Sequence, residues 1–120
     1  MPRLLHFPHF GDDRGWLVTY DPANNLHLPF EPKRVFWIYN VPKGKERANH
    51  AHETCSQIII PLNGGFVIEI DDNRYYLQHN TGLLVEPGYM IRLYAFSEDA
   101  ICLVLCDEAY DESEIQQSNS

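Results

Sequence analysis

The chain has 120 residues, of which 44% are hydrophobic, enough for one domain with a buried core that needs no disulfide or metal support. Seventeen Asp and Glu against nine Lys and Arg give a formal net charge of −8. This excess of acids argues against nucleic-acid and anionic-membrane partners, because both require a basic face. No segment approaches the roughly 20 apolar residues of a membrane span. The first residues carry no export pattern, so we expect a cytoplasmic protein.

In chain order, short apolar segments alternate with turn residues, which predicts many strands and almost no helix. The predicted strands are Gly15–Tyr20, Arg34–Val41, Ser56–Leu62, Phe66–Asp71, Arg74–Leu77, Gly82–Glu86, Met90–Phe96 and Ala100–Cys106. Their spacing predicts an all-β protein, a jelly-roll antiparallel barrel that forms one domain over residues 1–112. Residues 113–120 are polar and predict a C-terminal tail.

Two details of the strands carry further expectations. Ile58-Ile59-Ile60 does not alternate with polar residues, so this strand should be covered on both faces. We expect Phe36 and Trp37 to contribute to the core, because a sandwich strand buries one face.

The three cysteines are odd in number and lack a C-x-x-C spacing, which argues against a disulfide framework. Cys102 and Cys106 lie four apart in an apolar segment, so they would share one face of a strand. We expect them to be small buried hydrophobic residues.

The charges are unevenly distributed. Five of the nine cations lie between residues 33 and 47, and five of the seventeen acids lie between residues 107 and 114. The basic segment could receive an anionic small molecule, although a solvated loop would explain Lys43 and Lys45 equally well.

The most informative pattern is Gly44-x5-His50-Ala51-His52-x4-Gln57-x6-Gly64. On a strand, residues two apart point to the same side, so His50 and His52 would project together. The pattern resembles the first motif of the cupin barrels, with Gln57 in place of their acid. The segment that matches the second cupin motif, which begins at Pro87-Gly88, has no histidine.

Two histidines and an amide make a poor divalent-metal site, and His79, the remaining candidate ligand, lies in a turn-like segment. We therefore expect no metal and no other cofactor. Imidazoles without a metal are available for proton transfer near neutral pH.

A closer resemblance covers about residues 10–112. Its motifs are Phe10-x-Asp12-x-Arg14-Gly15, then Pro29-Phe30-x3-Arg34 continuing to Pro42, then Arg47-Ala48-Asn49-His50-Ala51-His52. Together they resemble the nucleotide-sugar 3,4-ketoisomerases. Those enzymes are cupins that act on dTDP-4-keto-6-deoxyglucose in deoxysugar biosynthesis, including that of lipopolysaccharide O-antigens.

The resemblance implies roles for individual residues. His50 and His52 would be the acid/base pair, with His52 as the base, and Arg47 would contact the substrate or its phosphates. The strand with Arg34 and Tyr39 would wall the sugar site, and Gln57 would join it. A homodimer is implied as well.

The chain also departs from the family pattern. Ala48 stands where glycine is usual, Glu53 follows the histidines where lysine is common, the tryptophan expected near Met90 is missing, and the C-terminal ending differs. A non-catalytic nucleotide-sugar-binding cupin, a nucleotide-sugar epimerase and a metal-dependent cupin therefore remain alternatives.

Overall fold

A computed structural model describes residues 1–51 and 54–109, and for Asn49 and His50 it describes the backbone only. Within these residues there are eleven strands and no helix. The strands are β1 (Arg3–His6), β2 (His9–Asp12), β3 (Gly15–Val18), β4 (Arg34–Tyr39), β5 (Arg47–Ala51), β6 (Gln57–Asn63), β7 (Val67–Ile70), β8 (Asn73–Tyr75), β9 (Thr81–Val85), β10 (Met90–Tyr94) and β11 (Ile101–Cys106). In this part of the chain, no helix is long and apolar enough to cross a membrane. The predicted tail at 113–120 lies outside the described residues.

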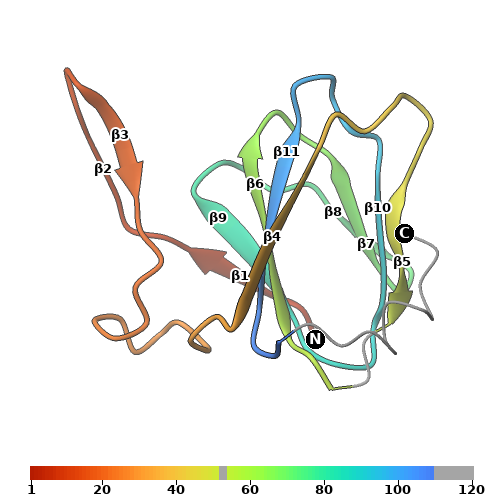
Figure 1. The fold of residues 1–120 in the computed structure, drawn as a ribbon, viewed down its shortest axis with the longest axis horizontal. Coiled ribbons are helices and arrows are strands. Elements are labelled where there is room, and N and C mark those ends of the chain that lie inside the picture. Colours follow the sequence, from red (N-terminus) through yellow and green to blue (C-terminus); the bar gives the residue numbers. More distant parts are fainter. Residues whose placement is uncertain (52–53, 110–120) are drawn as a thin grey trace.

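Two antiparallel sheets face each other, as Figure 1 shows. One has five strands in the order β1-β9-β6-β11-β4, and the other has four in the order β5-β10-β7-β8. The remaining pair, β2 and β3, forms a hairpin that extends away from the two sheets. The all-β, antiparallel prediction is confirmed.

The main core fills the space between the sheets, and a second core covers the outer face of the five-stranded sheet. β6 contributes to both, because Ile59 packs inward while Ile58 and Ile60 pack outward. The predicted burial of both faces of this strand is therefore confirmed. Cys102 and Cys106 both lie in the inner core, as expected from their spacing.

Every predicted strand has a counterpart, but β1, β2 and β5 were not predicted. β2 is exposed along its whole length, so its sequence has no reason to alternate. β5 has the sequence RANHA, which contains no β-branched or aromatic residue, so it lacks the composition by which strands are predicted.

The expectation for Trp37 was wrong. β4 alternates strictly: Phe36 and Ile38 pack on the inner core, and Trp37 on the opposite face is 61% exposed. β4 is the edge strand of its sheet, and no element within residues 1–51 and 54–109 covers Trp37.

A β-bulge interrupts the pairing of β5 with β10. His50 pairs with Ile91, but Ala48 pairs with Arg92, so the strand carries one extra residue at Asn49. Ala48 has a φ of 68°, the left-handed conformation that glycine adopts most readily. The position where the family usually has glycine is thus one where the backbone itself favours glycine.

We predict that Ala48→Gly stabilises the protein by about 0.5–1 kcal/mol, because it removes the steric cost of a left-handed alanine. Urea unfolding monitored by tryptophan fluorescence measures the change. Ala51→Gly is the matched control in the same strand, where the φ is not positive, and should destabilise by about 0.5–1 kcal/mol. Equal effects of the two substitutions would contradict the prediction.

Candidate functional site

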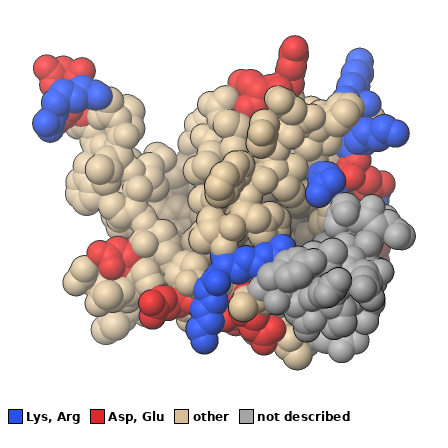
Figure 2. Space-filling view, viewed as in Figure 1, with Lys and Arg blue, Asp and Glu red and all other residues tan. Residues whose placement is uncertain are grey.

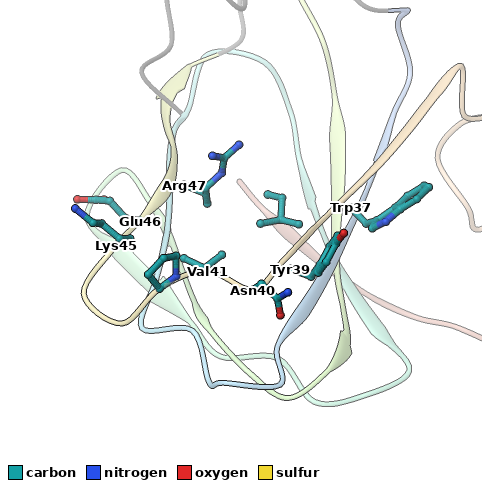
Figure 3. Close-up of a pocket in the computed structure, with 9 residues that line it drawn as sticks. Trp37, Tyr39, Asn40, Val41, Lys45, Glu46 and Arg47 are labelled. Carbon is teal, nitrogen blue, oxygen red and sulfur yellow. The ribbon is translucent and has the colours of Figure 1, made fainter.

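A pocket of about 460 Å³ opens where β4 ends and β5 begins, between the two sheets. The residues that line it are Trp37, Ile38, Tyr39, Asn40, Val41, Pro42, Lys45, Glu46 and Arg47 (Figure 3). The pocket joins two of the predicted site residues, Tyr39 and Arg47. Glu46 was not among the predicted site residues, although its position between Lys45 and Arg47 in the connecting loop was a usable signal.

The pocket is electropositive at its loop side. Lys45 and Arg47 are exposed, and neither forms an ion pair with any other described residue. Figure 3 shows the Arg47 side chain extending in the opposite direction from Lys45 and Glu46. Lys and Arg atoms also mark the loop between β4 and β5 at the upper right of Figure 2. Cations placed at an open pocket suit an anionic ligand.

The β5 bulge determines how the histidine segment meets the inner core. Arg47 pairs with Leu93 and His50 pairs with Ile91, and both partners on β10 are buried in that core. Residues three apart would normally lie on opposite faces of a strand, but the extra residue restores them to equivalent register positions. His52, the second predicted catalytic residue, lies outside the described residues.

Arg34 and Gln57 lie at the other end of the inner face, on either side of Cys106. Cys106 pairs with Arg34 on β4 and with Gln57 on β6. The amide Nε2 of Gln57 donates to Cys106 Sγ at 3.8 Å, and the Arg34 guanidinium lies over the Phe36 ring at 4.7 Å. Gln57 is buried, so its side-chain amide lies in the protein interior.

The thiol pKa values reflect this environment. A hydrogen bond with Cys106, assisted by burial, raises the pKa of the Cys55 thiol. The same hydrogen bond, together with the charge of Arg34, lowers the pKa of Cys106. Burial alone raises the pKa of Cys102 to about 12. The thiolate-stabilising groups therefore gather around Cys106.

The predicted site residues thus form two groups. Tyr39 and Arg47 lie at the pocket, and Arg34 and Gln57 lie together at the opposite end of β4. β4 and β5 run in opposite directions in Figure 1, so β5 leads from the first group toward the second. His50 is the fourth of the five residues of β5.

A charge network supports the pocket from the four-stranded sheet. Arg92 donates from Nε to Glu46 at 2.9 Å and from Nη1 to Glu69 at 2.7 Å. The Tyr94 hydroxyl donates to Glu69 at 2.8 Å, and Arg74 forms an ion pair with the same carboxylate at 3.4 Å. The Tyr94 hydrogen bond, followed by the two arginines, lowers the pKa of Glu69.

Comparisons with known proteins assign the family. The model of the family "FdtA: WxcM-like, C-terminal" matches residues 1–120. The chain belongs to this family. It is 31% identical to the TDP-4-oxo-6-deoxy-alpha-D-glucose-3,4-oxoisomerase of Aneurinibacillus thermoaerophilus, over 93% of this chain and 83% of that protein.

Solved structures of similar proteins agree with the fold. The sugar 3,4-ketoisomerase QdtA of Thermoanaerobacterium thermosaccharolyticum in complex with TDP is 30% identical, with a TM-score of 0.84 over 94% of this chain and 85% of that one. A histidine-to-asparagine mutant of QdtA in complex with TDP-4-keto-6-deoxyglucose is 29% identical, with a TM-score of 0.81 over 94% of this chain and 84% of that one. The predicted cupin jelly roll and the predicted isomerase are both confirmed.

The described residues of this family member contain no group of three or more His, Cys, Asp or Glu arranged to hold a metal ion. Gln57 donates to a cysteine, and the exposed His79 lies in a turn, as its sequence context suggested.

The Glu69 network predicts a pH dependence of stability. A lowered carboxylate pKa contributes stability that is present above the unfolded-state pKa and is lost as the pH falls through the folded-state pKa. Glu69→Gln should therefore lower stability at neutral pH, and its difference from the wild type should shrink toward about pH 3. Urea unfolding across this range measures both. The exposed Glu86→Gln is the control, and a Glu69→Gln deficit that stays constant with pH would contradict the prediction.

Proposed function

We propose that this protein moves the keto group of dTDP-4-keto-6-deoxyglucose from carbon 4 to carbon 3. The observation that carries the proposal is the 31% identity, over 93% of this chain, to the TDP-4-oxo-6-deoxy-alpha-D-glucose-3,4-oxoisomerase of Aneurinibacillus thermoaerophilus. It is supported by the relatives, one crystallised with TDP and one mutant crystallised with TDP-4-keto-6-deoxyglucose. We further propose that it acts in the cytoplasm, in deoxysugar biosynthesis that supplies lipopolysaccharide O-antigen, and binds neither nucleic acid nor membranes, in keeping with its net charge of −8.

The proposed reaction needs only proton transfers. The carbonyl at carbon 4 acidifies the proton at carbon 3, which a base removes while the carbon-4 oxygen gains a proton, giving an enediol. An acid then protonates carbon 4 while the carbon-3 hydroxyl loses its proton, and the ketone is left at carbon 3. We assign the base to His52 and the second proton to His50, without a metal or another cofactor, because positioned imidazoles suffice for such transfers.

Binding of the nucleotide sugar is proposed to use both groups of polar residues. Arg47, at a register position opposite the core residue Leu93, would contact a phosphate or the enediolate oxygen. Tyr39 would wall the outer part of the pocket, since it lies on the outward face of β4 and is 59% exposed. Arg34 and Gln57 would serve the deeper end of the site.

We predict that His52→Asn slows exchange of the carbon-3 proton by about 10²–10⁴-fold, the usual contribution of a positioned base. Incubation of the protein with dTDP-4-keto-6-deoxyglucose in deuterated water, followed by NMR, measures the exchange and locates the deuterium. His79→Asn, in an exposed turn, is the matched control and should exchange at the wild-type rate.

The same experiment separates the alternatives. Wild-type exchange in a folded His52→Asn protein would overturn the assignment of the base. Deuterium retained on a substrate whose keto group stays at carbon 4 would indicate an epimerase. No incorporation by the wild type, with TDP binding intact, would indicate a binding protein and overturn the proposed catalysis.

We also propose a homodimer in which the β2–β3 hairpin of one protomer packs against its partner. A two-stranded hairpin is marginally stable alone, and this one exposes several large apolar side chains. They are Phe10, Trp16, Leu17 and Val18, with Trp16 74% exposed. The outward face of the edge strand β4, with Val35, Trp37 and Tyr39, is a second uncovered apolar surface.

We predict that Trp16→Ser, on the hairpin, and Val35→Lys, on the outward face of β4, each weaken dimerisation by at least about tenfold, as expected for losing an apolar anchor. Sedimentation velocity at several protein concentrations measures the association. Tyr76→Ser removes a similarly exposed aromatic beyond β8 on the other sheet and should leave association unchanged. If the wild type stays monomeric at about 100 μM, its dimerisation Kd lies above that concentration and is too weak for a stable dimer. This result would overturn the proposal.

A further inference from the structure

The cationic pocket contains a carboxylate that ought to interfere with anion binding. Glu46 lines the pocket between Lys45 and Arg47 in the sequence. A free carboxylate this near to Arg47 would compete with the phosphates of a ligand for the same guanidinium. It would also repel a diphosphate directly.

In the structure Glu46 is turned away from Arg47 and bound elsewhere. Its Oε2 accepts from Arg92 Nε at 2.9 Å, and Figure 3 shows the two side chains extending in opposite directions. Arg47 pairs with Leu93, so the antiparallel register places the preceding residue, Glu46, opposite Tyr94. Arg92, two residues from Tyr94 on β10, is then the diagonal neighbour of Glu46 and lies within reach of its side chain.

Arg92 is itself held in place. Its Nη1 donates to the largely buried Glu69 at 2.7 Å, and its guanidinium lies 4.9 Å from the centre of the Tyr94 ring. Glu69 keeps two further partners, Tyr94 and Arg74, so it would remain satisfied without Arg92. Glu46 has no such reserve among the described residues, because its ion pair there is with Arg92 alone.

We propose that Arg92 is a positioning residue for the anion site: by holding Glu46 on the outer side of β5, it leaves Arg47 available to the diphosphate of a nucleotide sugar. This inference rests on the proposed function for its ligand. Arg92 is not among the residues that line the pocket, so its role is indirect. When Arg92 is lost, Glu46 is released and pairs with Arg47 or Lys45, and the pocket loses affinity for anions.

The test measures binding of TDP by isothermal titration calorimetry at low ionic strength. Arg92→Gln should raise the Kd about fivefold, the upper end of what an exposed ion pair contributes. Glu46→Gln should bind within twofold of the wild type. The double variant Glu46→Gln/Arg92→Gln should also return to within twofold, because the competing carboxylate is gone. This rescue separates the proposed role from a merely structural one.

Two further variants complete the design. Arg74→Gln breaks the ion pair with Glu69 without affecting Glu46, and should bind TDP as the wild type does. Arg92→Lys keeps the positive charge and should retain most of the wild-type affinity for TDP. This variant keeps the inference testable if Arg92→Gln folds poorly. The Arg92→Gln effect should also shrink as salt is added, because the competition is electrostatic.

The outcomes distinguish this inference from the proposed function. Unchanged TDP binding by Arg92→Gln, or a double variant as weak as Arg92→Gln, overturns the inference even if the isomerase reaction proceeds. The expected pattern of affinities without deuterium exchange supports the inference and overturns the catalysis. A wild type that binds no TDP overturns both.

Discussion

The pairing of β5 with β10 is the constraint on which the site depends. Without its extra residue, Arg47 and His50 would occupy opposite faces of the strand, since side chains alternate along a β-strand. With it, both stand opposite residues of the inner core. The conformation that permits this is the left-handed backbone of Ala48, an unfavourable choice for any residue with a Cβ. The segment that carries the proposed site residues thus retains local strain that the surrounding pairs hold in place.

The edge strand β4 serves two purposes with its two faces. Its inward residues, Phe36 and Ile38, complete the core between the sheets, while Trp37 and Tyr39 on the outward face remain uncovered. Because the strand ends at the pocket, any partner that covers its outward face also borders the ligand site. The proposed dimer contact and the candidate ligand pocket are therefore adjacent on this part of the surface.

Much of the fold could be predicted from the sequence, because most strands are apolar, β-branched and separated by strong turn residues. β5 could not, since RANHA carries no hydrophobic pattern, and its bulge is visible only once the partner strand is known. Trp37 was wrongly predicted to lie in the core, because composition alone does not show which residues of an alternating edge strand face inward. The contact of Arg92 with Glu46 joins residues 46 positions apart, so no local pattern predicts it.

The burial of all three cysteines has a practical consequence. The native surface offers no thiol to alkylating or oxidising reagents, and the nucleophilicity of Cys102 is further suppressed because its pKa is raised to about 12. A single cysteine introduced on the hairpin or beside the pocket would therefore be the one reactive thiol of the folded protein. Burial of the three natural thiols thus favours selective labelling of an introduced cysteine while the protein stays folded.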